Sequence, residues 1–471
     1  MSFSLVVVLS KNYAIEYDES CPWSSSEYSD YFNGLTKDGV VVMGRKTFES
    51  LPLNKRPLGN NAINVVLSSE YPKYQGLHTD TLVFGNVFTL TNDIKIKYPT
   101  KDVWVIGGLE VYQALSNYCQ SAIIVHLDKT VKNATKYFVD LSPGYELMGY
   151  TEKRWSNDEQ CNYRVLHYTR NSMSASFNQE SQYLSMLSNI LTTGQARDDR
   201  TGVGTIGTFG GQLKFDVSQY LPLLTTKFVP VNIIIKELLW FLRGETDNRI
   251  LQKQNVHIWD GNSSREFLDA RGLKHYKEGD IGASYGFVWN HFGAEYHDCE
   301  TNYEGKGFNQ IEYILDLLKN DPFSRRILMS SWNPPGMKDM ALPPCHVLFQ
   351  LYVEEDPDTH VRYVSGHLYQ RSSDYFLAAN YNLVSYTILL YILCQKVGYA
   401  PRNMFMSFGD VHIYKNHVKQ VKTQLSRNPR PQPILRLNDG ITTKSFKDIT
   451  VDDFELIGYF PQAAISAPMA I

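Results

Sequence analysis

The pattern of apolar residues changes once along this chain of 471 residues, near residues 170–182. Before that point, short apolar runs bounded by turn residues alternate with polar stretches, and helical stretches such as residues 108–116 follow several of the runs. The runs are SLVVVL, GVVVMG, INVVLSS, DVWVIGG and AIIVHL. Apolar runs of this length that alternate with helices predict an α/β domain built around a central sheet.

After the change, the apolar residues recur at helical spacing. Residues 182–191, 231–242 and 381–393 each form such a run, and 231–242 is apolar almost all round. The last property predicts a buried helix. Its one carboxylate, Glu237, then needs a partner or a function, because an unpaired buried charge is destabilising or becomes protonated. The alternative is a glutamate at the helix edge that reaches water.

The length fits roughly two to four domains. Residues 171–179 are polar and few, without a tether rich in proline or glycine, so we expect a brief junction and not a long flexible linker. The predicted organisation is one domain over residues 1–170, a junction over 171–181 and a second domain over 182–471.

Composition excludes several classes of protein. With 43% hydrophobic and 20% charged residues, the chain is not intrinsically disordered. The net charge of −3 gives no general attraction to nucleic acid or an acidic membrane, so any anion site must be built from a few local arginines. No apolar run has the length of a membrane span, and the opening MSFSLVVVLSKNY lacks the features of a signal peptide. Six scattered cysteines predict a reducing cytoplasm, with no disulfide framework and no metal site.

One cysteine stands where a nucleophile is expected. Cys345 follows Pro343-Pro344 and precedes the strand-like residues 347–350. A thiolate needs positive charge nearby, and Arg371, after the strand-like residues 361–369, supplies it. A cysteine followed by a histidine is a weak signal by itself, and core packing is the alternative.

The surrounding motifs carry a resemblance. Residues 182–471 resemble thymidylate synthase in these blocks: Asp199-Arg200-Thr201-Gly202, Leu223-Leu224-Thr225-Thr226-Lys227, Glu237–Leu242, Ile258-Trp259-Asp260, Tyr285-Gly286, Ser324-Arg325-Arg326, Pro344-Cys345-His346, Gln370-Arg371-Ser372, Tyr381-Asn382-Leu383, Gly409–Tyr414 and Pro468–Ile471. Residues 1–170 resemble dihydrofolate reductase in Pro22-Trp23, Met43–Thr47, Leu67-Ser68-Ser69 and Ile106-Gly107-Gly108. The order of the two domains is similar to that of the bifunctional enzymes of protists and plants.

The first resemblance implies an α+β domain that methylates dUMP to dTMP with 5,10-methylenetetrahydrofolate. Cys345 would attack C6 of the pyrimidine, Glu237 would be the general acid or base, and Tyr285 and His346 would support proton handling. The implied dUMP site is Arg200, Gln370, Arg371, Ser372, Ser373, Asp374, Asn382, His412 and Tyr414, with Arg325 and Arg326 from the partner of a homodimer. The implied folate contacts are Trp259, Asp374 and Ala470.

Guanidinium groups suit phosphate oxygens, which accounts for an anion site on a slightly acidic protein. Asn382 has two interpretations. As an amide it offers a donor and an acceptor to the uracil edge, and as an asparagine it would also cap a helix that begins near Leu383.

The second domain departs from its family at a few positions. The usual Gly-x-Pro-Phe-Asn is Ala378-Ala379-Asn380-Tyr381-Asn382, the usual His-Pro near the end is Gln462-Ala463, and Phe228 replaces a basic residue. We expect these changes to affect the folate tail more than the chemistry.

The first domain keeps the motifs that form the cofactor side of the site in its family. The resemblance implies NADPH at a helix N-terminus, a strand-end hydroxyl and a glycine turn, which suit phosphates. The residues concerned are Gly44, Arg45, Lys46, Thr47, Leu67, Ser68, Ser69, Gly107, Gly108, Leu109 and Glu110.

The folate half of that domain is altered. Spacing from Phe32 places Tyr28 at the position of the family's carboxylate, and Glu27 lies one residue away, about 100° around the helix. A pteridine needs a carboxylate to accept two donors in one plane.

Three further positions differ, because Val125, Ala62 and Glu16 stand where the family has Thr, Arg and Gly. Two interpretations compete: a working reductase that uses Glu27, and a remnant that serves as a scaffold or a weak nucleotide-binding module.

Overall fold

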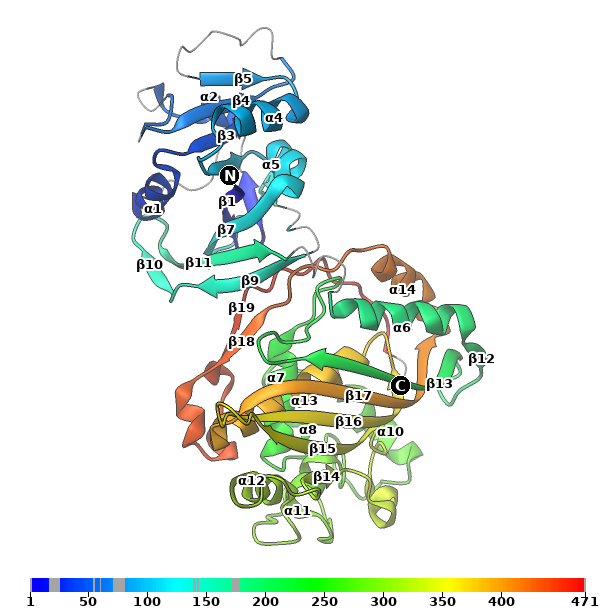
Figure 1. The fold of residues 1–471 in the computed structure, drawn as a ribbon. Coiled ribbons are helices and arrows are strands. Elements are labelled where there is room, and N and C mark those ends of the chain that lie inside the picture. Colours follow the sequence, from blue (N-terminus) through cyan, green and yellow to red (C-terminus); the bar gives the residue numbers. More distant parts are fainter. Residues whose placement is uncertain are drawn as a thin grey trace. The chain divides into compact units, whose positions relative to one another are not determined.

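The computed structural model describes residues 2–16, 26–53, 56–59, 61–70, 81–138, 141, 144–171 and 178–469, without the side chains of Ser26 and Ser29. The chain divides into two compact units, Met1–Asn178 and Gln179–Ile471, which are described separately (Figure 1). Among the described residues, no helix has the length and apolar character needed to cross a membrane.

Unit 1 is built around a nine-stranded sheet in the order β10-β11-β7-β1-β6-β3-β4-β5, with β9 also paired to β11. The strands are β1 (Phe3–Ser10), β3 (Val40–Gly44), β4 (Ile63–Leu67), β5 (Thr81–Phe84), β6 (Val103–Gly107), β7 (Cys119–Leu127), β9 (Tyr145–Tyr150), β10 (Arg154–Ser156) and β11 (Cys161–Arg170). Strands β1, β3, β4, β5, β6 and β7 pair in parallel, and their continuous apolar runs are buried on both faces. The predicted α/β domain with a central sheet is confirmed.

Helices follow the strands of unit 1. They are α1 (Ser26–Thr36), α2 (Arg45–Ser50), α4 (Val87–Lys97) and α5 (Leu109–Leu115), followed by the short turn η2 (Ser116–Tyr118). A separate two-stranded pair joins β2 (Ala14–Glu16) to β8 (Lys136–Tyr137). Because α2 starts directly after β3 and α5 directly after the Gly107–Gly108 turn that ends β6, two helix N-termini lie at the same edge of the sheet.

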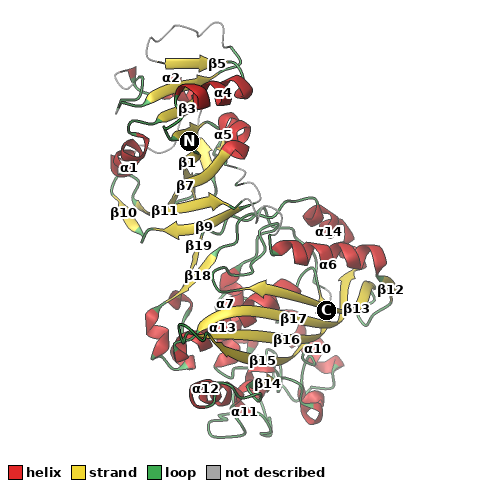
Figure 2. Cartoon of the chain, in the orientation of Figure 1, coloured by secondary structure: helices red, strands yellow, loops and turns green. Residues whose placement is uncertain are grey.

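Unit 2 contains a six-stranded sheet in the order β12-β13-β17-β16-β15-β14 (Figure 2). The strands are β12 (Gln195–Arg197), β13 (Thr205–Asp216), β14 (Leu328–Ser330), β15 (His346–Glu355), β16 (Arg362–Asp374) and β17 (Ala400–Tyr414). β18 (Ile434–Leu437) and β19 (Phe454–Ile457) form a separate pair. The helices are α6 (Glu180–Thr193), α7 (Val231–Leu242), α8 (Asn248–Gln252), α9 (Asp260–Ser263), α10 (Arg265–Ala270), α11 (Tyr285–His291), α12 (Gln310–Asn320), α13 (Ala379–Val397) and α14 (Val418–Leu425).

The two faces of this sheet differ. Helix α13 packs on β16 and β17 and against α7, and it is buried from Leu383 to Cys394. The opposite face carries exposed aromatic rings, with Tyr352 64% and Tyr369 40% exposed, around a hollow lined by Lys214, His367 and Phe405 among others. An uncovered sheet face with exposed rings is typical of an interaction surface.

Two local predictions need correction. Helix α7 begins and ends where the apolar pattern predicted, but α13 begins at Ala379, two residues before the predicted start. Asn382 therefore lies inside the first turn, its N–H bonded to the carbonyl of Ala378, so the alternative role as a helix cap is wrong. Strand β16 also continues through Asp374, so Arg371 lies within the strand.

Candidate active site

The nucleophile expected from the sequence is fixed through its backbone. Cys345 lies one residue before β15, where its N–H donates to the hydroxyl of Tyr285 at 2.7 Å. Its carbonyl accepts from the N–H of Arg371 at 2.9 Å. Because both contacts use backbone atoms, the thiol is held in place without being consumed in a hydrogen bond.

Positive charge lies close to this thiol. Burial raises the pKa of Cys345, while Arg371 and Arg200 lower it. Arg371 donates from Nε to the carbonyl of Pro344 at 2.7 Å and from Nη2 to that of Pro343 at 3.1 Å. These bonds use two of the five guanidinium donors, which leaves others for an anion. The geometry suits a thiolate beside a bound phosphate.

A stack of neutral rings lies behind the nucleophile. The rings of Tyr285 and His346 are parallel, with centroids 3.8 Å apart, and Nδ1 of His346 lies 2.8 Å from the hydroxyl of Tyr386. Burial lowers the pKa of His346 to about 3 and raises the pKa of both tyrosines. His346 is therefore uncharged at neutral pH and acts as a hydrogen-bonding group, not as a cation for the thiolate.

Glu237 has a hydrogen-bond partner, which the sequence did not identify. The indole Nε1 of Trp259 donates to its Oε1 at 2.7 Å. Burial raises the pKa of Glu237 to about 7, and the indole hydrogen bond lowers it only in part. Since the partner is neutral, the carboxyl titrates close to neutral pH, which is the range that a general acid or base needs.

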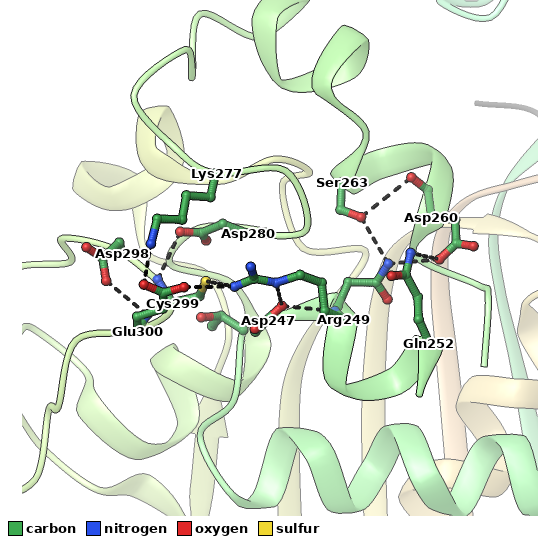
Figure 3. Close-up of polar contacts among 12 residues, drawn as sticks. Asp247, Arg249, Gln252, Asp260, Ser263, Lys277, Asp280, Asp298, Cys299 and Glu300 are labelled. Atoms are coloured by element: carbon green, nitrogen blue, oxygen red, sulfur yellow. Dashed lines mark hydrogen bonds and ion pairs between the residues drawn. The ribbon is translucent and has the colours of Figure 1, made fainter. Parts of the chain in front are cut away.

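A polar network holds the segment that carries Trp259 (Figure 3). Asp260 accepts from Asn248 and Gln252, each at 2.9 Å, and pairs with Nδ1 of His257 at 2.8 Å. Asn248 also donates to Ser263 at 3.0 Å. These bonds tie α8 to α9 and fix the indole that bonds Glu237.

The same network extends to the following loop (Figure 3). Arg249 pairs with Asp247 at 2.8 Å and with Glu300 at 3.1 Å, and Lys277 pairs with Glu300 as well. Burial, with Asp280 and Asp247 nearby, raises the pKa of the Cys299 thiol to about 12. The acidic neighbours of Cys299 disfavour a thiolate there, whereas Arg371 and Arg200 favour one at Cys345.

Several residues expected at the nucleotide lie at the same end of the two central strands of the sheet. Strands β16 and β17 run parallel, with Ser372 opposite Asp410 and Asp374 opposite His412. His412 pairs through Nδ1 with Asp410 at 2.7 Å, and burial raises the pKa of nearby Tyr414 to about 12.

Buried polar atoms at this end of β16 fit a bound nucleotide. Both amide atoms of Gln370 and the hydroxyl of Ser373 are buried, and none has a hydrogen-bond partner among the described residues. Native proteins rarely leave such atoms unpaired, so they indicate a ligand in this place.

The other residues implied for the site are exposed, form no side-chain hydrogen bond with a described residue, or lie outside the described residues. Arg200 is exposed near Cys345, and the amide of Asn382 forms no hydrogen bond with a described residue. Arg325 and Arg326 are exposed, and neither side chain has a hydrogen bond or ion pair within the described part of the chain. Ala470, like Pro22 and Trp23, lies outside the described residues.

Two of the residues that depart from the family pattern, Asn380 and Gln462, form hydrogen bonds with other segments. Asn380 donates to the carbonyl of Pro222 at 2.9 Å and accepts from the N–H of Leu224 at 3.4 Å. Gln462 donates from its backbone to Thr225 at 2.7 Å and from its side chain to Asn428 at 2.8 Å. Phe228 is half-exposed with its ring 6.2 Å from that of Tyr459. Ala378 occupies the N-cap of α13.

Two site residues were missed in the sequence. Tyr386 bonds His346 from within α13, and Trp332 lies under the guanidinium of Arg371, at 5.4 Å from ring centroid to Cζ. Tyr386 belongs to an apolar helical run in which nothing distinguishes one buried ring from another, so only the packing shows its role.

Unit 1 has a cradle that fits phosphate groups. Gly44 and Gly108 are the N-caps of α2 and α5, and a Cβ added to Gly44 would lie 3.6 Å from the Gly108 nitrogen. Gly107 has φ 122°, and a Cβ there would lie 3.1 Å from the hydroxyl of Tyr112. Two helix N-termini thus lie close together beside a glycine whose positive φ disfavours any other residue, which suits the phosphates of a dinucleotide.

The other residues expected at this cofactor surround the cradle. A Cβ on Gly108 would lie 3.4 Å from Oγ1 of Thr47, and Arg45 pairs with Glu49 at 2.8 Å and Glu70 at 3.4 Å. Ser68 is buried, Leu67 and Leu109 are partly buried, and Lys46, Ser69 and Glu110 are exposed.

The expected folate side of unit 1 does not present a carboxylate at the predicted position. Tyr28 is 7% exposed and donates its hydroxyl to Glu159 at 3.1 Å, and Lys129 pairs with Glu159 at 2.7 Å. Val125 lies in the same apolar cluster, and Phe32 packs against it. A phenol and a branched alkyl group do not offer the two coplanar acceptors that a pteridine needs.

The alternative carboxylate, Glu27, faces another segment. Its Oε1 accepts from the backbone N–H of Asn157 at 3.0 Å. A local change of helix register would have to break this contact before Glu27 reached the position of Tyr28.

Comparisons with known proteins agree with this geometry. The family model for thymidylate synthase matches residues 181–471, and the model for dihydrofolate reductase matches residues 2–170. The bifunctional dihydrofolate reductase-thymidylate synthase of Paramecium tetraurelia is 37% identical over all of this chain and 99% of its own length. The corresponding protein of Leishmania major is 37% identical over all of this chain and 95% of its own. The thymidylate synthase of human herpesvirus 8 is 46% identical over 62% of this chain and 85% of its own.

Proposed function

Because the chain belongs to the bifunctional dihydrofolate reductase–thymidylate synthase family, we propose that unit 2 methylates dUMP through a covalent adduct of Cys345. The observation that carries this proposal is a cysteine whose backbone is held by Tyr285 and Arg371 and whose thiol has two arginines nearby. In this family the synthase is a methyltransferase that uses 5,10-methylenetetrahydrofolate, and the reductase is an oxidoreductase that uses NADPH.

Each step uses side chains described above. Arg371 and Arg200 hold the phosphate, and the thiolate of Cys345 attacks C6 of the pyrimidine so that C5 becomes a nucleophile. Glu237, with its pKa near 7, exchanges a proton with the base. Asn382 reads the uracil edge.

The remaining residues place the two substrates. His412 and Tyr414 hold the deoxyribose, and Gln370, Ser372 and Ser373 complete the nucleotide site. The folate supplies the one-carbon unit and the hydride when bound, and Trp259 and Asp374 hold it.

Replacement of the nucleophile tests this proposal. Cys345→Ser should abolish dTMP formation while dUMP still binds, because a hydroxyl is a far weaker nucleophile than a thiolate. Cys299→Ser, at the thiol with acidic neighbours, should retain turnover. If Cys345→Ser turned over within about tenfold of wild type, covalent catalysis by this residue would be excluded.

For unit 1 we propose binding of NADPH without appreciable reduction of dihydrofolate. The glycine cradle supports the first part, and Tyr28 with Val125 supports the second. Steady-state oxidation of NADPH with dihydrofolate should be negligible in wild type, with some gain in Tyr28→Asp combined with Ala62→Arg. Robust reduction by wild type would favour the alternative, in which Glu27 serves as the carboxylate and both domains are active.

We also propose a cytoplasmic homodimer. The uncovered face of the unit 2 sheet supports an interface, and the exposed Arg325 and Arg326 support a site completed by the second subunit. The described cysteines are all free thiols, including the nucleophile, and they need a reducing compartment.

A further inference from the structure

A buried carboxylate at the start of unit 2 is surrounded by donors. Glu180, the first residue of α6, is 1% exposed. It accepts from the N–H and hydroxyl of Thr225 at 2.8 and 2.6 Å, and from the N–H and hydroxyl of Thr226 at 3.0 and 2.5 Å. Four donors from two consecutive residues fix the path of the 225–226 backbone.

The same two threonines are linked to residues 462–463, near the end of the described residues. The carbonyl of Thr225 accepts from the N–H of Gln462 at 2.7 Å. Arg427 donates through Nη1 to the carbonyls of Thr226 and Ala463, both at 2.7 Å. Movement of residues 225–226 would therefore move residues 462–463 as well.

The next residue is a buried lysine. Lys227 is 6% exposed, its Nζ donates to the carbonyl of Phe376, and the ammonium lies 3.8 Å from the centroid of the Phe376 ring. Burial lowers the pKa of Lys227 to about 8, while Asp374 and Glu180 act in the opposite direction.

Asp374 is the other charged member of this group. Burial raises its pKa, and the hydrogen bond from the N–H of Leu377 at 3.1 Å opposes that shift, as do His417, His412 and Lys227. Glu180 thus fixes the backbone beside a lysine that bonds the segment after Asp374.

The first turn of α6 also fixes the strand end that carries this aspartate. The rings of Tyr183 and Tyr375 stack at 4.6 Å. The hydroxyl of Tyr183 donates to the carbonyl of Tyr375 at 2.7 Å, and that of Tyr375 donates to the carbonyl of Tyr183 at 3.2 Å. Helix α6 therefore contacts both the segment that carries Lys227 and the segment that carries Asp374.

We propose that Glu180 is a positioning residue of the synthase site. It holds residues 225–227 so that the Lys227 ammonium stays on the carbonyl of Phe376, two residues after Asp374, and residues 462–463 keep their position. This inference rests on the proposed function, in which Asp374 contacts the folate. It assigns to Glu180 a larger effect on the folate side of the site than on the nucleotide side.

The test is Glu180→Gln in the full chain. An amide has one acceptor oxygen where the carboxylate serves four donors, so residues 225–227 lose their register. We expect the KM for 5,10-methylenetetrahydrofolate to rise about tenfold or more while the KM for dUMP stays within about threefold. The loss of negative charge also disfavours the Lys227 ammonium, so the basic limb of the pH profile of kcat/KM should move to lower pH.

Three variants complete the design. Glu180→Asp keeps the charge and should return the basic limb toward that of wild type. Glu266→Gln removes an exposed carboxylate of the same unit and should change neither KM. If Glu180→Gln does not fold, Thr226→Val removes one of the four donors from the other side of the contact and should give the same selective rise in the folate KM.

A Glu180→Gln enzyme with a lower melting temperature but wild-type folate KM and basic limb would overturn the proposal and leave Glu180 a purely structural anchor. The Cys345→Ser result separates this outcome from failure of the synthase assignment, because it does not depend on α6.

Discussion

Two glutamates of unit 2, the buried Glu180 and the partly buried Glu237, differ in the donors around them. Glu180 accepts four hydrogen bonds from Thr225 and Thr226, whereas Glu237 accepts one from the indole of Trp259. A carboxylate surrounded by donors serves as an anchor. One with a single neutral donor titrates near neutral pH, as the pKa of about 7 for Glu237 indicates. Burial raises the pKa of both carboxyls, and the bonds from Thr225 and Thr226 oppose this shift at Glu180 as the indole bond does at Glu237.

The raised pKa of Glu237 predicts a pH-dependent stability. A carboxyl whose pKa rises from 4.5 to about 7 on folding binds protons more tightly in the native state than in the unfolded state. Its contribution to the free energy of unfolding is therefore full below pH 4.5 and is lost as pH rises through 7. Glu237→Gln removes this titration. Relative to wild type, the variant should gain free energy of unfolding between pH 5 and pH 8, by at most about 3 kcal/mol because the side chain keeps some exposure. Urea denaturation at both pH values measures the difference, and an equal offset at the two would contradict the shift.

Asn382 predicts which pyrimidine is used. Its amide offers a donor and an acceptor to O4 and N3–H of uracil, whereas cytosine presents the reverse pattern. Asn382→Asp should weaken dUMP turnover and raise dCMP turnover, shifting the preference by about one to two decades, because mismatched buried hydrogen bonds cost about 1–3 kcal/mol. Competition between the two nucleotides measures the shift. A variant that keeps the wild-type preference would show that the base is read elsewhere.

At the scale of elements, the sequence predicted the regular parts well and the tertiary ones poorly. Apolar periodicity predicted α7 with its bounds and the parallel strands of unit 1, because burial alone decides those patterns. It missed the start of α13, where Asn380 bonds the backbone of Pro222 and Leu224, far away in the chain. No local pattern reports such a contact.

The contact of Asn380 predicts a measurable loss of stability. Asn380→Ala leaves the carbonyl of Pro222 and the N–H of Leu224 without this partner in a buried setting, which should cost about 1–3 kcal/mol in the unfolding of unit 2. Asn320→Ala is the matched control, since it removes an exposed hydrogen bond to Asp316 and should cost little. Equal midpoints of urea denaturation for the two variants would show that the Asn380 bonds contribute nothing.

At the scale of the whole molecule, the candidate site was predicted by motif resemblance and not by periodicity. Motifs identified Cys345 and Arg371, and spacing placed Tyr28 at the carboxylate position. Motifs and spacing did not predict the contact of Tyr28 with Glu159, because these two residues lie more than one hundred positions apart. They did not predict the neutral rings behind Cys345, because those depend on enclosure by other elements. The assignment of every site residue to its role stays a prediction.

The last prediction concerns the second subunit. Arg326 is exposed and has no side-chain hydrogen bond or ion pair in the described part of its own chain, as expected of a residue that serves a neighbouring site. A two-fold dimer would then hold two sites, each with a thiol from one chain and an arginine from the other. Cys345→Ser and Arg326→Ala homodimers should both be impaired.

Mixing the two variants should restore activity. After subunit exchange, each heterodimer contains one site with an intact Cys345 from one chain and an intact Arg326 from the other, and its second site lacks both. With random exchange half of the dimers are mixed, so the pool should regain about a quarter of the wild-type sites. Activity that stays at the average of the two homodimers, although exchange is shown by tagged chains, would mean that Arg326 serves its own chain or no site at all.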